Sequence, residues 1–489
     1  MTLVKHIDEI RRMASDQLDQ GRRSDRGQFM TPSSVANFMV SLFQKWPKNV
    51  RLLDPGAGVG SLSEAFARQF KKKSVRFSRL DMTAYEIEPL LATYLRERMA
   101  NLGCNEEGSL ITSKVLEQDF IPEGSFAASF GIIRFTHIIL NPPYKKISAD
   151  SAERKSLQAM GVEVPNLYVA FLALAVGLTE EGGEIVAIIP RSFCNGSYFR
   201  PFRHWLLQRV AITHVHIFES RRKIFGDDNV LQENIIVRLV RNQAPGTVTV
   251  SQSKDNSFED CRQRKVPFSE IVKSDDKESY IHVPLTERSW PVHLFAHRLA
   301  DLGIEVSTGP VVDFRAKESW LEQPDGNCAP LLYAHHFPKG VFQWPRNHKK
   351  PNAISITPAT KKILMPRGWY VAIKRFSSKE EKRRVVAYVV DPNRLPYDFY
   401  GFENHLNILH VEKRGMSEDM ARGVALYLNS TLVDTFFRTF SGHTQVNATD
   451  LRMMRFPEKD KLVQFGAWAR SESEPTQEKI DAFIQSYGK

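Results

Sequence analysis

Short apolar runs recur through the first half of the chain, and their spacing constrains the fold more than any other feature of the sequence. The runs cover residues 51–53, 82–85, 115–116, 137–140, 184–189 and 235–239. Longer segments of helix-compatible composition lie between several of them, at 61–72, 89–102 and 167–178. Strands that alternate with helices in this way are typical of a doubly wound parallel sheet. We therefore predict an α/β fold for this half, closed at its edge by a hairpin of the last strands.

After residue 241 this alternation stops. Polar sequence with turn residues follows to about residue 280, and the rest of the chain is irregular and rich in proline and aromatic residues. A length of 489 residues is enough for two or three domains. We predict a helical arm at 1–25, the doubly wound domain at 26–245, a connection at 246–283 and a second, mixed α/β domain at 284–489.

A glycine-rich turn follows the first predicted strand. It contains Asp54, Gly56, Ala57, Gly58 and Gly60. Glycines allow positive φ and the close approach of a ligand to the backbone, and doubly wound sheets bind ligands at such turns. A tight turn without a ligand is the alternative. Because the chain has no G-x-x-x-x-G-K-[S/T] phosphate loop, a nucleoside without phosphates fits this turn better than a nucleoside triphosphate.

Acidic residues stand at the ends of the next two predicted strands, Glu86 before Ile87 and Asp119 before Phe120. A carboxylate at the end of the second strand is suited to hold the ribose hydroxyls of a nucleoside. Asp119 could accept a hydrogen bond from an adenine amino group, with Ile87 and Phe120 against the faces of the ring. Each acid alone could be a solvated loop residue, but their register with the glycine turn favours a binding site.

The tetrapeptide Asn141-Pro142-Pro143-Tyr144 directly follows the fourth predicted strand. Its prolines hold the preceding residues extended, which directs the Asn141 side chain and the Pro142 carbonyl at small entropic cost. These two oxygens can accept both hydrogens of one planar amino group. The nitrogen then becomes pyramidal and can attack a methyl group on a positively charged sulfonium, without a metal or a strong base. Tyr144 would stack on the ring that carries the amine.

These motifs, in this order, resemble those of the amino-group DNA methyltransferases that place a recognition domain after the catalytic domain. The segment 26–32 is similar to the family's N-terminal cofactor motif. The resemblance implies an S-adenosylmethionine-dependent catalytic domain at 26–245 and a target-recognition domain at 284–489. It also implies that fourteen residues bind the cofactor. They are the five named residues of the glycine turn together with Glu86, Ile87, Asp119, Phe120, Gln28, Thr31, Pro32, Asn141 and Pro143.

By the same resemblance, the substrate is N6 of an adenine that leaves the stack of duplex DNA. Tyr144 and Phe225 would then sandwich the flipped base, although Phe225 could equally be a buried loop residue. Three alternatives stay open: N4 of cytosine, an amine in RNA or a protein glutamine, and a DNA-binding subunit without activity. Asn141 itself favours adenine, because the cytosine group more often has serine there.

The basic residues of the chain are concentrated in one block. Between 339 and 384 there are thirteen Lys and Arg against two acids, which equals the net charge of +11 of the whole chain. Aromatic residues interleave with these charges, as on surfaces that meet phosphates and bases together. A solvated surface is the alternative. The predicted DNA contacts are Lys349, Lys350, Lys361, Lys362, Arg367, Lys374, Arg375, Lys382, Arg383 and Arg384.

The remaining expectations concern partners and location. Segments 306–309 and 442–447 are similar to parts of the family's recognition domains. Four cysteines without a C-x-x-C pair predict neither a disulfide framework nor a metal site. We expect no membrane segment and a bacterial cytoplasmic protein that acts on double-stranded DNA as a monomer. A separate restriction endonuclease for the same site is an expected companion.

Overall fold

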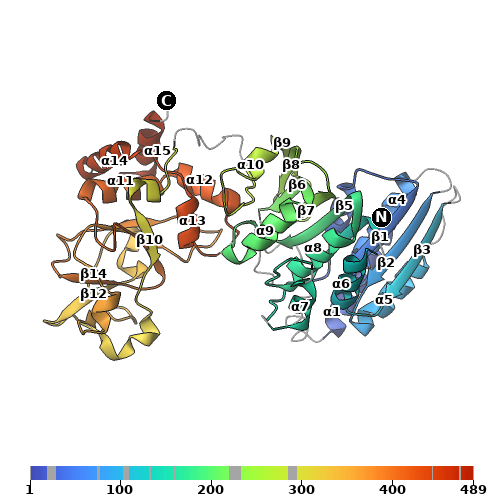
Figure 1. Ribbon diagram of the computed structural model, residues 1–489, viewed down its shortest axis with the longest axis horizontal. Helices are drawn as coiled ribbons and strands as arrows, with labels where there is room; N and C mark the ends of the chain where they lie inside the picture. Colours follow the sequence, from blue (N-terminus) through green and yellow to red (C-terminus); the bar gives the residue numbers. More distant parts are fainter. Residues whose placement is uncertain are drawn as a thin grey trace. The chain divides into compact units, whose positions relative to one another are not determined.

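The computed structural model describes residues 2–18, 29–73, 78–102, 109–131, 134–148, 150–158, 160–219, 233–284, 295–442, 444–472 and 475–487. The chain divides into two compact units, Met1–Leu285 and Thr286–Lys489 (Figure 1). No helix in the described residues is long and apolar enough to cross a lipid bilayer.

The first unit is built on one sheet of nine strands in the order β3-β2-β1-β4-β5-β7-β6-β8-β9. The first five strands run parallel, whereas β7 is antiparallel to both of its neighbours, β5 and β6. The strands are β1 (Asn49–Pro55), β2 (Arg79–Tyr85), β3 (Leu110–Leu116), β4 (Phe135–Leu140), β5 (Thr179–Pro190), β6 (Val210–Phe218), β7 (Asn234–Arg241), β8 (Thr247–Ser253) and β9 (Arg262–Pro267). The predicted doubly wound α/β fold is confirmed.

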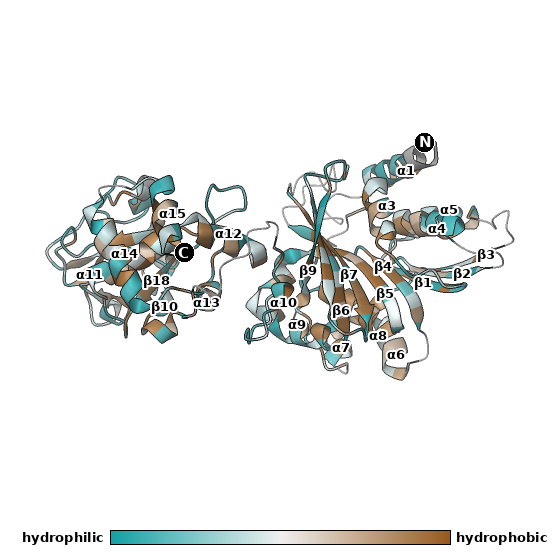
Figure 2. Cartoon of the chain, turned by 90° about the horizontal axis from the view of Figure 1, so that it is seen from above, coloured by the Kyte–Doolittle hydropathy of each residue, from teal (hydrophilic) through white to brown (hydrophobic). Residues whose placement is uncertain are grey.

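Helices cover both faces of this sheet (Figure 2). One layer holds α3 (Ser33–Ser41), α4 (Ser61–Lys73) and α5 (Pro89–Ala100), with α1 (Thr2–Gln17) packed against it. The other layer holds α6 (Phe120–Phe130), α7 (Ala152–Gln158), α8 (Leu167–Leu178) and α9 (Arg200–Leu207). Because both faces are covered, β4 is buried along its whole length, as expected for a central parallel strand.

The sequence prediction misplaced the edge of the sheet. The hairpin partners β6 and β7 lie inside the sheet, and β8 and β9 extend it beyond them. Both of these strands, and the short helix α10 (Phe268–Ile271), fall in the stretch 246–283 that was predicted to be a connection. The mostly polar β8 buries Val248 and Val250 on one face, and this two-residue period is hard to recognise in polar sequence.

The second unit combines two smaller sheets with a group of helices. One sheet has the order β10-β18-β15-β16 and the other β11-β13-β12-β17-β14. The strands are β10 (Glu305–Thr308), β11 (Trp320–Leu321), β12 (Cys328–Leu332), β13 (Ala353–Ser355), β14 (Met365–Pro366), β15 (Tyr370–Lys374), β16 (Ala387–Val390), β17 (Phe399–Phe402) and β18 (Leu406–His410). The helices are α11 (Glu418–Leu428), α12 (Thr431–Phe440), α13 (Ala448–Met453), α14 (Lys459–Ser471) and α15 (Gln477–Ser486). The unit is therefore mixed α/β.

Helices α11 and α14 pack backbone to backbone at two glycines. A Cβ atom on Gly423 would overlap the Leu462 carbonyl oxygen, and one on Gly466 would overlap the Asp419 carbonyl oxygen. Neither oxygen can withdraw without moving its helix. The two glycines therefore set the distance between these helices.

We predict that Gly423→Ala and Gly466→Ala each lower the free energy of unfolding of the second unit by about 2 kcal/mol or more, because overpacking forces the helices apart. Gly326→Ala is the matched control, since a Cβ atom there would meet open space. Thermal unfolding of the three variants measures the effect. Equal melting temperatures for Gly466→Ala and Gly326→Ala would contradict the close packing.

Candidate active site

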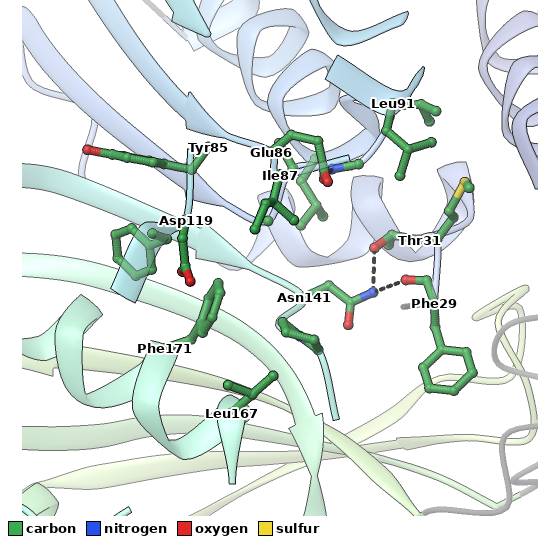
Figure 3. A pocket seen from close by; sticks show the side chains of 18 of the residues that line it. Phe29, Thr31, Tyr85, Glu86, Ile87, Leu91, Asp119, Asn141, Leu167 and Phe171 are labelled. Carbon is green, nitrogen blue, oxygen red and sulfur yellow. Dashed lines mark hydrogen bonds between the residues drawn. The ribbon is translucent and has the colours of Figure 1, made fainter. Parts of the chain in front are cut away.

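A cavity of about 260 Å³ lies where β1, β2, β3 and β4 end (Figure 3). Ten of the fourteen residues predicted to bind the cofactor line it. They are Thr31, Gly56, Ala57, Gly58, Glu86, Ile87, Asp119, Phe120, Asn141 and Pro143. Pro32, Asp54 and Gly60 do not line the cavity, and Gln28 lies outside the described residues.

The glycine turn after β1 is held by its own backbone geometry. Gly56, Gly58 and Gly60 have φ angles of +74°, +58° and +89°. Residues with a Cβ atom rarely adopt such positive values. The backbone N–H groups of Gly56 and Ala57 both donate to the Tyr85 carbonyl oxygen at 2.9 Å. A Cβ atom on Gly60 would also come within 2.8 Å of Leu95 Cδ1. Gly56 and Gly58 thus present only backbone to the cavity, beside the side chains of Ala57 and Val59.

Glu86, at the end of β2, is fixed by two backbone amides. Its Oε2 accepts from the Gly58 N–H and its Oε1 from the Glu88 N–H, both at 2.8 Å. The residue is only 4% exposed, and this burial raises the pKa of its carboxyl group above the ordinary value. One carboxylate oxygen therefore ties the acidic side chain directly to the glycine turn.

Asp119 caps helix α6, because its Oδ1 accepts from the Ile121 N–H at 2.9 Å. Its side chain remains exposed at the cavity. The adjacent Phe120 is buried, with its ring 5.2 Å from that of Tyr85 and 5.1 Å from that of Phe171. Ile87 also lines the cavity, and its side chain is 51% exposed.

The carboxamide of Asn141 is held in one orientation (Figure 3). Its Nδ2 donates to the Phe29 carbonyl oxygen at 2.7 Å and to Thr31 Oγ1 at 3.0 Å. Both amide hydrogens are therefore used, and Oδ1 is left as the acceptor on the other side. The segment 29–31, which is part of the predicted N-terminal cofactor motif at 26–32, thus contacts the predicted catalytic loop directly.

Tyr144 is placed differently from an exposed stacking platform. The side chain is 8% exposed, and its ring lies 5.5 Å from that of Phe29 and 6.3 Å from that of Tyr168. Its hydroxyl donates to Asn141 Oδ1 at 3.0 Å. Burial raises the pKa of this hydroxyl well above its ordinary value, so it stays a donor at neutral pH. Phe225, the other predicted stacking residue, lies outside the described residues.

Several apolar residues of the cavity were not predicted from the sequence. They are Phe29, Met30, Val59, Leu62, Tyr85, Leu91, Ile121, Leu167 and Phe171. Phe171 belongs to α8, and the apolar sequence of this helix predicts a core position for every one of its residues. Its place on the cavity wall follows only from the packing of α8 beside α6.

Most of the predicted DNA contacts in the second unit are accessible. Lys349, Lys361, Lys362, Arg367 and Lys382 are exposed, and Lys350, Lys374, Arg375 and Arg383 are half-buried. Lys374 pairs with Glu381 at 2.7 Å, whereas Arg375 and Arg383 donate to the carbonyl oxygens of Asn404 and Asn429. The side chains of Lys374, Arg375 and Arg383 therefore already have partners within the second unit.

Arg384 was assigned wrongly as a DNA contact. It is 1% exposed, its backbone N–H donates to Asp434 Oδ1 at 2.6 Å, and its Nη2 donates to Ser441 Oγ at 3.1 Å. Its guanidinium also lies 5.4 Å from the Phe437 ring. This arginine lies just before β16 and is bound to α12 and its C-cap residue inside the unit, so it cannot reach a phosphate.

The chain is similar to known restriction–modification methyltransferases. The family model of the Eco57I restriction-modification methylase matches residues 62–225. The chain is 46% identical to the type II methyltransferase M.BsuBI of Bacillus subtilis, over 91% of this chain and 90% of that one. It is 39% identical to the type II methyltransferase M.PstI of Providencia stuartii, over 98% and 96%. A solved DrdV–DNA complex is 13% identical and covers 92% of this chain and 57% of that one, with a TM-score of 0.48.

The first unit has a doubly wound, Rossmann-like α/β fold, with the candidate site at the ends of its parallel strands. The chain belongs to the type II methyltransferases, the DNA methyltransferases of restriction–modification systems.

Asp54, at the end of β1, has a role inside the fold. It is fully buried and accepts from Ser63 Oγ at 2.6 Å. Burial raises the pKa of its carboxyl group to about 7, against a smaller lowering by the Ser63 hydrogen bonds. Its protonated form therefore stabilises the folded chain below about pH 4, and this contribution is lost as the pH rises through about 7.

We predict that Asp54→Asn removes this pH dependence, because an amide stays neutral. Between pH 5 and 8, wild-type stability should fall relative to the variant by roughly 1.4 kcal/mol for each pH unit at most. Thermal unfolding across this range measures the difference, with the exposed Asp16→Asn as the control. Parallel curves for the wild type and Asp54→Asn would contradict the assignment.

Proposed function

We propose that this protein transfers a methyl group from S-adenosylmethionine to N6 of an adenine in duplex DNA. One observation carries the proposal: the carboxamide of Asn141 is held at the cavity wall with both N–H groups satisfied by residues 29 and 31. This arrangement leaves an oxygen acceptor for a substrate amine beside a site suited to a nucleoside.

The cavity fits the proposed cofactor in shape and in polar groups. Glycines without side chains line one wall, and Glu86 and Asp119 present carboxylates at the ends of neighbouring strands. Glu86 would hold ribose hydroxyls, and Asp119 would accept from the adenine amino group. Ile87, Phe120 and Phe171 supply apolar surface for the rings and the methionine arm. When bound, S-adenosylmethionine supplies a methyl group that is already activated by a positively charged sulfur.

The catalytic loop would then act by hydrogen bonding. Asn141 Oδ1 and the Pro142 carbonyl oxygen can accept the two hydrogens of a planar amine, which favours the pyramidal nitrogen that attacks. The hydroxyl of Tyr144 donates to this same Oδ1 in the structure. Because Oδ1 has two lone pairs, it can accept a hydrogen of a substrate amine beside the Tyr144 hydroxyl, which can also donate to the Ile188 carbonyl oxygen at 3.3 Å.

An adenine inside a duplex cannot enter this site while it is stacked, so the base must flip out of the helix. The aromatic residues next to the loop would receive it, with Tyr144 as the first candidate for stacking. The ring of Tyr144 contacts those of Phe29 and Tyr168, and the ring of Tyr168 lies 6.0 Å from that of Phe199.

The second unit would supply contacts to the DNA. Its exposed cations, Lys349, Lys361, Lys362, Arg367 and Lys382, are suited to phosphates, whose contacts position a protein without reading sequence. We further propose that the enzyme works in the bacterial cytoplasm as a monomer, alongside a separate restriction endonuclease for the same site. N4 of cytosine is the alternative substrate, because the same loop can hold either amine.

We predict that Asn141→Ala lowers methyl transfer by at least about a hundredfold, the scale of losing one preorganised hydrogen-bond partner of a transition state. Cofactor affinity should change much less, because Glu86 and the glycine turn are intact. Turnover with DNA and a separate titration with S-adenosylmethionine measure the two effects. Asn101→Ala, at an exposed asparagine after α5, is the control. Turnover near the wild-type rate in Asn141→Ala would remove the catalytic assignment.

We predict that reversing Lys361 and Lys362 to Glu weakens DNA binding and reduces the slope of log affinity against log salt by about 1 to 2, because fewer counterions are released. The control reverses Lys459 and Lys479, which are equally exposed on α14 and α15 outside the basic block. Titrations at several salt concentrations give both slopes. An unchanged slope for the first pair, or equal changes for both pairs, would show that this part of the block does not meet DNA.

A further inference from the structure

Helix α1 packs against the back of the cavity wall. Its Ile7 and Ala14 are fully buried in a cluster with Met30, Val59 and Leu91. These last three residues also line the cavity. The apolar side of α1 therefore supports residues from the N-terminal motif, the glycine turn and α5 together. A displacement of α1 would therefore remove packing contacts from Met30, Val59 and Leu91.

A single carboxylate connects α1 to helix α3. Asp8 Oδ1 accepts from the Ser33 backbone N–H at 3.1 Å, and Asp8 Oδ2 accepts from Ser33 Oγ at 2.5 Å. Ser33 is the first residue of α3, and the preceding N-cap residue, Pro32, makes no side-chain cap. Asp8 thus provides the cap from another helix, and its negative charge also suits the positive end of the α3 dipole. Arg11 Nε lies 3.4 Å from Asp8 Oδ1 and pairs with the carboxylate electrostatically.

The capped end of α3 leads directly to the catalytic loop. Only two residues separate Ser33 from Met30, and between them Thr31 is 6% exposed and accepts one N–H of Asn141 through its Oγ1. The Phe29 carbonyl oxygen accepts the other. A carboxamide can rotate to exchange its nitrogen and oxygen, and these two acceptors prevent it. The position of residues 29–31 therefore decides whether Asn141 offers an oxygen or a nitrogen to a substrate amine.

We propose that α1 contributes to the active site. Asp8 is then a positioning residue that acts through Ser33 on the cavity and on the orientation of the Asn141 amide. This proposal rests on the proposed function, since it assigns Asp8 to the same methyl transfer. Asp8 itself touches neither ligand. Its effect is transmitted by the segment 29–33 and by the apolar contacts of α1.

The test compares Asp8→Ala with Asp16→Ala, which removes an exposed carboxylate from the same helix. Three quantities are measured for each full-length variant: affinity for S-adenosylmethionine without DNA, turnover at saturating cofactor, and hydrogen exchange of the amides at 29–41. We expect Asp8→Ala to weaken cofactor binding and to slow turnover by about five- to tenfold each, the scale of one lost helix cap. Exchange at 29–41 should quicken, and Asp16→Ala should match the wild type in all three.

Two further variants separate positioning from a loss of folding. Asp8→Asn keeps an oxygen acceptor for the Ser33 N–H and should recover part of the lost turnover. Asp8→Ala combined with Thr31→Val should cost less than the sum of the single changes, because both interrupt the same path to Asn141.

The proposal is overturned if Asp8→Ala matches Asp16→Ala in affinity and turnover. It is also overturned if only hydrogen exchange changes, because Asp8 would then merely stabilise α3. The exchange measurement needs neither cofactor nor DNA. A wild-type protein that transfers no methyl group would therefore refute the proposed function, while faster exchange in Asp8→Ala would still identify the cap.

Discussion

The parallel pairing of β1 with β4 is the constraint on which the rest of the site depends. Leu52 and Leu53 of β1 pair with His137 and Ile138 of β4, so the two strands end at the same edge of the sheet. The order of strands reverses here, since β2 and β3 lie on the other side of β1. Ligands of doubly wound sheets bind at this reversal. The glycine turn and the Asn-Pro-Pro-Tyr loop, although some eighty residues apart, therefore border one cavity.

Apolar burial and hydrogen bonding have different roles in the first unit. The centre of the sheet and α8 are almost entirely apolar, which stabilises the scaffold but gives no direction to a side chain. Direction comes from a small number of polar contacts at the strand ends. Glu86 is held by the glycine turn, and Asn141 is held by residues 29 and 31. Each of these contacts joins segments that are distant in the sequence.

The sequence was informative where a residue type has one local meaning. Glycines at positive φ, paired prolines and acids at strand ends are such signals, and ten of the fourteen predicted cofactor residues line the cavity. It was uninformative where the meaning depends on packing. Phe171 could not be told from core, and the proposed role of α1 depends on two hydrogen bonds between Asp8 and Ser33 and on the apolar contacts of the helix. The charge of Arg384 suggested DNA, but charge in a sequence does not show that the side chain is buried.

The central claim is that the amide of Asn141 serves an adenine amine, and the chemical identity of the product tests it most directly. The wild-type protein is incubated with unmethylated genomic DNA and labelled S-adenosylmethionine, and the DNA is digested to nucleosides for mass spectrometry. We predict that the label appears in N6-methyladenine. Label in N4-methylcytosine would contradict the choice of base while keeping the chemistry of the loop, and DNA without label would contradict the proposed reaction itself.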